Sequence, residues 1–160
     1  MNIPISFLIL NPLEALVVIM GCDIFTNRKF NISKDIKHIY ILGTINLIVQ
    51  IFLHSFKSDI LGLLLNIFVP FIISPYITKI YYNKYLGEVK YLQVFIVQAF
   101  YMITTSAIIY LFDGYSNTIY TVNYIDLNYE IGINICKAVF QIILLFILRR
   151  IKNEKSQIDA

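Results

Sequence analysis

Charged residues are scarce in this sequence. Only 14% of its 160 residues are Asp, Glu, Lys or Arg, whereas soluble domains carry roughly 25%. The hydrophobic share is 58% and the mean hydropathy is +0.71. These values exclude an ordinary soluble globular domain and predict an integral membrane protein. Because a membrane-crossing helix takes about 20 apolar residues, five crossings leave no room for a soluble catalytic domain.

Cysteine and the common catalytic motifs are also in short supply. Cys22 and Cys136 are the two cysteines and neither belongs to a CxxC pair, so we expect free packing thiols and no disulfide or metal site. The sequence contains no HExxH, P-loop, GxSxG or paired-carboxylate motif. A cysteine protease built on Cys22 and His38 lacks a third orienting group. We therefore expect a protein that is not an enzyme and has no catalytic residues, metal or cofactor.

Long apolar stretches predict an all-α, polytopic transmembrane helical bundle, formed as a single integral membrane domain over residues 1–160. The five predicted spans are residues 3–25, 39–56, 60–82, 91–112 and 131–148. Pro70 and Pro75 predict a kink or an early end in the third span. The segment before Asn11 lacks the positive region of a secretory signal, so we expect the first span to be retained.

Lysine and arginine alternate between the connections. Residues 26–38 and 149–155 hold four basic residues each, whereas residues 54–59 hold only Lys57 and residues 113–130 hold none. This is the positive-inside pattern, and it places the N-terminus outside and the C-terminus inside the cell membrane, for which we expect a bacterial inner membrane. The net charge of +3 then belongs to the inner membrane edge, where it meets anionic lipid, so we expect no nucleic-acid partner.

Each span carries one face of polar or small side chains. Asn46 and Gln50 repeat at i, i+4 in the second span, and Lys137 and Gln141 do so in the fifth. Two explanations stay open. The faces pack against one another through small residues and interhelical hydrogen bonds, or they line a polar cavity that holds a ligand or a peptide.

Two ionisable residues fall within the spans, Glu14 in the first and Lys137 in the fifth. An ionisable residue inside a membrane is a functional candidate by default. If the first and fifth helices are neighbours, a Glu14–Lys137 pair neutralises both charges. A packing pair, a ligand site and separate snorkelling of Lys137 to the outer surface remain open. The candidate ligand-binding residues are Glu14, Asn46, Gln50, Lys137 and Gln141.

Polar residues near the span ends are expected to be solvated or to lie among lipid headgroups. Asp23 and His38 are expected to be solvent-exposed, and tyrosines at span ends, Tyr81 and Tyr82 among them, to form an aromatic belt. We expect residues 113–130 to rest on the headgroups or to cover an external mouth, with residues 118–122 extended.

A short run near the N-terminus resembles a known family. It reads Asn11-Pro12-Leu13-Glu14-Ala15-Leu16, continues apolar to Phe25 and enters a basic loop at Arg28. It is similar to the start of the polytopic membrane input domains of accessory-gene-regulator-type peptide-sensing histidine kinases, and beyond it the resemblance concerns span number and orientation. The resemblance implies quorum sensing and signal transduction. Because no phospho-acceptor helix or ATP-binding domain is present before Ala160, we expect a detached input domain without kinase activity.

The leading hypothesis is a non-enzymatic, sensor-like membrane module that binds a peptide or small hydrophobic ligand from outside and acts through a cytoplasmic or membrane protein partner. Residues 149–155 are expected to continue as a short inner helix toward that partner. One alternative is a small transporter subunit or substrate-capture component. The other is a structural membrane scaffold, in which the polar stripes tolerate Ala or Leu.

Overall fold

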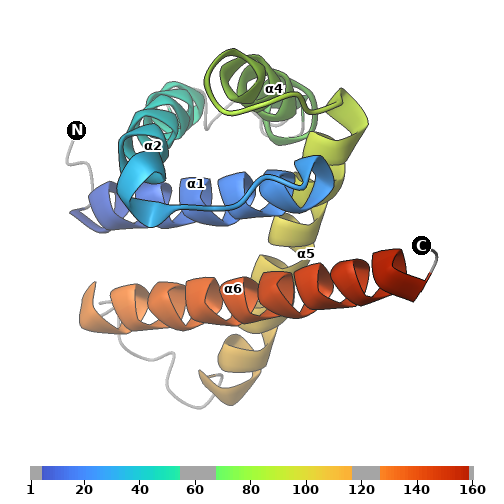
Figure 1. Cartoon of the computed structure of the whole chain (residues 1–160). Coiled ribbons are helices and arrows are strands. Elements are labelled where there is room, and N and C mark those ends of the chain that lie inside the picture. The colour runs from blue at the N-terminus through green and yellow to red at the C-terminus, as the bar shows by residue number, and fades with distance from the viewer. Residues whose placement is uncertain (1–4, 55–67, 117–126, 159–160) are drawn as a thin grey trace.

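The computed structural model describes residues 5–54, 68–116 and 127–158, and all regular structure in these ranges is helical (Figure 1). The elements in order are α1 (Ile5–Thr26), α2 (Ile32–His54), a π-helical turn η1 (Val69–Ile73), α4 (Ser74–Tyr85), α5 (Tyr91–Ser116) and α6 (Leu127–Ile158). The all-α class predicted from the sequence is confirmed for these residues.

Helices α1, α2, α5 and α6 coincide in sequence with four of the predicted spans. The remaining prediction, residues 60–82, lies partly outside the described residues, and its described part is η1 and most of α4. Among the described residues, Tyr91–Ile108 of α5 is the one stretch long and apolar enough to cross a membrane. Five crossings therefore remain a prediction. The predicted inner helix over residues 149–155 is present as the continuation of α6.

Helix α1 occupies the centre of the described structure. Figure 1 shows α1 and α6 side by side and running in the same direction, with α2 and α4 on the other side of α1. Helix α5 crosses α1 and α6 steeply and also contacts α4. This crossing departs from the bundle of side-by-side spans that the sequence predicts. Apolar stretches define helix lengths but contain no information on crossing angles, so the sequence could not predict it.

The core explains why α1 is central. Nearly every side chain of α1 from Ala15 to Asp23 is buried, as expected of a helix that is apolar on all sides. Three apolar clusters surround it, and they add α2 with Leu42, α5 with Val97 and α6 with Leu145. Gly43 of α2 is packed so closely that a Cβ there would lie 2.8 Å from the backbone nitrogen of Pro12.

The turn between α1 and α2 is defined by two asparagines. Asn27 has φ 56°, the left-handed conformation that commonly ends a helix. The Asn31 side chain accepts hydrogen bonds from the backbone N–H groups of Ser33 and Lys34, at 3.1 and 3.3 Å, and caps α2. In return, Asp35 accepts a hydrogen bond from the Asn31 N–H. These contacts bring the first turn of α2 back beside the end of α1.

The predicted interruption near Pro70 and Pro75 is present. The chain forms the π-helical turn η1 and then enters α4, with the buried Pro75 in its first turn. Proline has no N–H, so it cannot donate to the carbonyl oxygen of Phe71, four residues earlier. The Tyr91 hydroxyl donates to that oxygen instead, at 3.1 Å. Tyr91 thereby joins the start of α5 to the interrupted helix.

Candidate functional site

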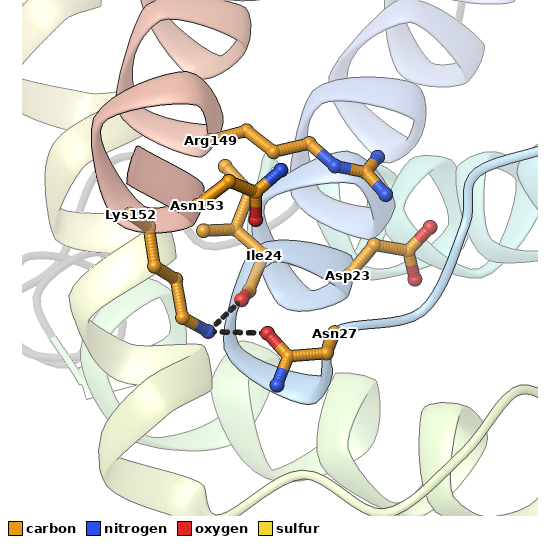
Figure 2. A pocket seen from close by; sticks show the side chains of 6 residues that line it. All are labelled: Asp23, Ile24, Asn27, Arg149, Lys152 and Asn153. Atoms are coloured by element: carbon orange, nitrogen blue, oxygen red, sulfur yellow. Dashed lines mark hydrogen bonds between the residues drawn. The ribbon is translucent and has the colours of Figure 1, made fainter. Parts of the chain in front are cut away.

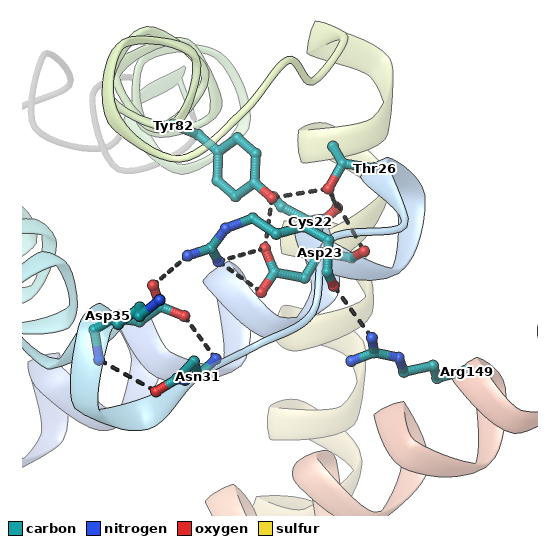
Figure 3. Close-up of polar contacts among 9 residues, drawn as sticks. Cys22, Asp23, Thr26, Asn31, Asp35, Tyr82 and Arg149 are labelled. Atoms are coloured by element: carbon teal, nitrogen blue, oxygen red, sulfur yellow. Dashed lines mark hydrogen bonds and ion pairs between the residues drawn. The ribbon is translucent and has the colours of Figure 1, made fainter.

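A buried carboxylate organises the polar contacts at the C-terminal end of α1. Asp23 is 1% exposed, and it accepts two hydrogen bonds from Arg28, at 3.0 and 2.9 Å, and one from the Tyr82 hydroxyl of α4 (Figure 3). Arg28 also pairs with the buried Asp35 of α2. We call Asp23, Arg28, Asp35 and Tyr82 the Asp23 network. The expectation that Asp23 is solvated is wrong, because the turn folds Arg28 back over it.

The Asp23 network joins three helices through one guanidinium. Two carboxylates share Arg28, and the Tyr82 hydroxyl also lies 2.9 Å from the Thr26 hydroxyl. Burial by itself lowers the pKa of Arg28, but hydrogen bonds to Asp35 and Asp23 outweigh burial and raise it. Arg28 therefore stays charged and links α1 to α2, while Tyr82 links both to α4.

His38 and Tyr81 form a second contact between α2 and α4. Nδ1 of His38 lies 2.9 Å from the Tyr81 hydroxyl, and the two rings meet edge to face. Tyr81 and Tyr82 are buried, so the aromatic-belt interpretation is wrong for these two tyrosines. His38 is partly buried, not fully solvent-exposed as expected. Burial lowers the pKa of His38, and the nearby positive charge of Lys37 lowers it further.

A pocket of ≈ 190 Å³ lies between the C-terminal ends of α1 and α6. Figure 2 shows the α6 side chains facing the last turn of α1 across it. Lys152 donates to the carbonyl oxygen of Ile24 and to Oδ1 of Asn27, the latter at 2.7 Å. Arg149 donates to the carbonyl oxygen of Arg28 at 3.2 Å. We call this site the α1–α6 pocket; its lining residues are Asp23, Ile24, Asn27, Arg149, Lys152 and Asn153.

Three of the predicted ligand-binding residues belong to one interhelical region. Glu14 of α1 and Lys137 of α6 attract each other electrostatically, and the Lys137 ammonium lies 5.3 Å from the centre of the Tyr101 ring of α5. Gln141, one turn after Lys137, donates to the Tyr101 carbonyl oxygen and to the hydroxyls of Thr104 and Thr105. We call Glu14, Tyr101, Lys137 and Gln141 the Glu14 cluster. Glu14 and Lys137 lie on the contacting helices α1 and α6 and interact electrostatically, and their direct ion pair stays a prediction.

One atom of the Glu14 cluster lacks a hydrogen-bond partner. Gln141 is 0% exposed, and its Oε1 is buried with no hydrogen-bond partner among the described residues. The amide orientation is fixed by its neighbours, because the Tyr101 carbonyl oxygen can only accept and the Thr104 hydroxyl already donates to the helix backbone. The acceptor therefore points away from both groups, and a buried acceptor of this kind costs about 1–3 kcal/mol.

The other two predicted ligand-binding residues are on α2. Asn46 is buried, but no contact among the described residues joins it to the Glu14 cluster, and α2 lies on the opposite side of α1 from α6 (Figure 1). The side chain of Gln50 lies outside the described residues. The sequence periodicity identified one polar face per helix, but it could not show that the α2 and α6 faces meet different sides of α1.

Sequence reasoning missed the Asp23 network. Asp23, Arg28 and Asp35 alternate in charge across a helix, turn and helix, which is a signal for a local ion-pair network. The basic residues of this turn indicate orientation and contribute to the family resemblance, but the sequence does not show that Arg28 folds back over Asp23. Tyr82 is 59 residues from Asp23 along the chain, so no local pattern reveals that contact.

The remaining candidates give no further site. Cys22 is a buried free thiol in the apolar core and Cys136 is an exposed one. No group of three metal-ligating side chains occurs within the described ranges. Residues 118–122 of the predicted external flap lie outside those ranges. Comparisons with family models, curated proteins and solved structures found no match.

Proposed function

We propose that this chain is a multi-pass membrane protein with its N-terminus outside and its C-terminus inside. The supporting observation is the outer surface of α5 and α6, where large apolar side chains are exposed, including Ile103 at 68% and Phe146 at 58%. Apolar surfaces of this extent are typical of contact with lipid or with another protein. Helices α1 and α6 run in the same direction. This is expected if they are the first and the fifth of five spans, because both would then run from outside to inside and end near the basic residues.

We further propose that the protein is a non-enzymatic, sensor-like module that binds a peptide or small hydrophobic ligand and acts through a partner protein. The observation that carries this proposal is the continuity of α6. One rigid helix contributes Lys137 and Gln141 to the Glu14 cluster, and Arg149 and Lys152 to the α1–α6 pocket. A ligand that competes for Glu14 or Gln141 would change how α6 lies against α1 at both sites.

The resemblance to peptide-sensing histidine kinase input domains agrees with this direction of coupling. In that family the last span leads into a cytoplasmic signalling helix. Here α6 continues as a helix beyond the pocket to Ile158. A partner that contacts the end of α6 would receive the displacement, and no kinase chemistry is required of this chain.

The coupling is tested by distance measurement between the ends of α1 and α6. Spin labels are placed at the exposed residues Phe25 and Asn153 in a Cys136→Ser background, and the label distance is measured in nanodiscs. Glu14→Gln is expected to shift or broaden the distance distribution, because it removes the attraction to Lys137. Glu88→Gln is the matched control, since Glu88 is exposed in the connection before α5. An unchanged distribution in Glu14→Gln would leave the scaffold alternative.

Membrane orientation is tested separately. Reporter fusions or cysteine labelling are expected to place residue 34 inside and residue 120 outside the cell. The same side for both residues would overturn the proposed topology. Co-purification with an ATPase would instead favour the transporter-subunit alternative.

A further inference from the structure

We propose that the α1–α6 pocket binds the phosphate group of an anionic lipid, with Arg149 and Lys152 as the recognising cations. This inference rests on the proposed membrane placement and is separate from the ligand site in the Glu14 cluster. Basic pockets between membrane helices on the inner side are a recognised binding mode for anionic headgroups.

The charge of the pocket favours an anion. Asp23 lines the pocket, but its carboxylate is already bonded by Arg28 and Tyr82. Arg149 and Lys152 bind backbone and amide oxygens, and among the described residues neither has a carboxylate within ion-pair distance. Arg28 is shared by Asp23 and Asp35, so these two carboxylates, Arg28, Arg149 and Lys152 together leave one net positive charge at the pocket.

Arg149 and Lys152 each have more N–H donors than the hydrogen bonds that they make to α1 and to the turn that follows it. Arg149 uses one guanidinium N–H on the carbonyl oxygen of Arg28, and the planar group offers others that suit phosphate geometry. Lys152 keeps a further ammonium hydrogen beyond its bonds to Ile24 and Asn27. A phosphate group in the pocket can accept hydrogen bonds from these remaining donors while the contacts that link α6 to α1 persist.

The size and surroundings of the pocket favour a lipid headgroup. Its volume of ≈ 190 Å³ is below the roughly 300–1,000 Å³ typical of sites for drug-sized ligands, which suits a phosphate group better than a whole organic ligand. Three apolar side chains of α6 next to the two cations are exposed: Ile147, Leu148 and Ile151. Acyl chains can lie along these residues while the phosphate occupies the pocket.

The test measures lipid binding to the detergent-solubilised full chain by native mass spectrometry. The probes are phosphatidic acid, phosphatidylcholine and inorganic phosphate. Arg149→Gln is expected to weaken phosphatidic acid binding about tenfold, the equivalent of one charge-assisted hydrogen bond. Arg150→Gln is the matched control: it removes the same charge one residue away, and Arg150 is 83% exposed and paired with Glu154. It is expected to bind phosphatidic acid like the unmodified chain.

A folding defect is separated from a binding defect by two features of the design. Arg149→Lys keeps the charge and is expected to retain part of the affinity, and mass spectrometry counts lipid only on intact folded protein. An equal loss in Arg150→Gln, or equal binding of phosphatidylcholine, would overturn the proposal. Displacement of phosphatidic acid by inorganic phosphate at equal concentration would replace the lipid by a free anion and overturn the lipid assignment. None of these results affects the Glu14 coupling experiment.

Discussion

Helix α1 meets α2 and α6 on opposite sides, and the two interfaces are built differently. Toward α2, the backbones approach at Gly43, and the Asp23 network closes the far end of the contact with a shared guanidinium. Toward α6, the polar contacts are made by the long side chains of Arg149 and Lys152, beside one apolar cluster that includes Leu145. The α2 side contains two buried carboxylates bonded to one guanidinium, whereas the α6 side contains long cationic side chains bonded to backbone and amide oxygens.

The contrast assigns different mechanical properties to the two interfaces. A contact between backbones cannot slide without steric clash, and a buried ion network cannot open without leaving charges unpaired. Long side chains can follow a small displacement while their hydrogen bonds persist. We therefore expect α1 and α2 to move as one body and α6 to be the helix that shifts, which is the property a signalling helix requires.

The largest expected effect is on the α2 side. Asp23→Asn weakens the hydrogen bonds that Arg28 and Tyr82 donate to the carboxylate, while Arg28 keeps its pair with Asp35. Hydrogen bonds to a charged group contribute about 1.5–3 kcal/mol, and we expect a loss of this size. The free energy of unfolding in mild detergent measures the loss. Glu154→Gln is the matched control, because its pair with Arg150 is exposed and contributes about 0–1 kcal/mol. Equal losses in both variants would contradict the distinction drawn between the two interfaces.

The next effect tests the close approach of α1 and α2. Gly43→Ala places a Cβ 2.8 Å from the Pro12 nitrogen, and backbone atoms there cannot move aside. We expect a loss of about 1–3 kcal/mol, as for overpacking elsewhere. Gly132→Ala in α6 is the control, since a Cβ there meets nothing within 4 Å, and a gain of up to about 1 kcal/mol from helix propensity is expected. Unchanged stability in Gly43→Ala would show that α1 and α2 are free to separate.

The sequence predicts the helices of this protein better than their contacts. Apolar length located α1, α2, α5 and α6, because hydrophobic burial depends on local composition. The electrostatic attraction between Glu14 and Lys137 was expected from the cost of isolated charges in apolar surroundings, and their direct ion pair stays a prediction. The contact between Asp23 and Tyr82 was not expected, because 59 residues separate them and their meeting depends on how α4 packs. Asn46 illustrates the same limit, since periodicity gives a face but not its neighbour.

A smaller effect is expected where α6 contacts α5. Gln141→Leu removes the side-chain NH2, whose two hydrogens are shared among the Tyr101 carbonyl oxygen and the Thr104 and Thr105 hydroxyls, but also removes the buried Oε1, which has no partner among the described residues. These contributions oppose each other, and the Thr104 hydroxyl keeps its backbone acceptors. We expect the free energy of unfolding to change by less than about 1 kcal/mol. A loss as large as that of Asp23→Asn would show that the α5–α6 contact contributes as much to stability as the Asp23 network.

The smallest effect concerns the pH dependence of the α2–α4 contact. Burial and Lys37 lower the pKa of His38 below its ordinary value of 6.5, so the unfolded chain binds a proton at a higher pH than the folded protein does. At a pH above the pKa that His38 has in the unfolded chain, the folded protein keeps its full stability. This stability is lost progressively as the pH falls below about 6.5. Because His38 is only partly buried and solvent screens its charge, we expect a decrease in Tm of about 1 °C. Between pH 7 and 5 the Tm of His38→Gln should fall by about 1 °C less than the Tm of the unmodified chain, because the variant lacks the imidazole. Thermal unfolding at both pH values measures this difference. Equal pH dependence in the two proteins would show that His38 does not contribute to the stability of the α2–α4 contact.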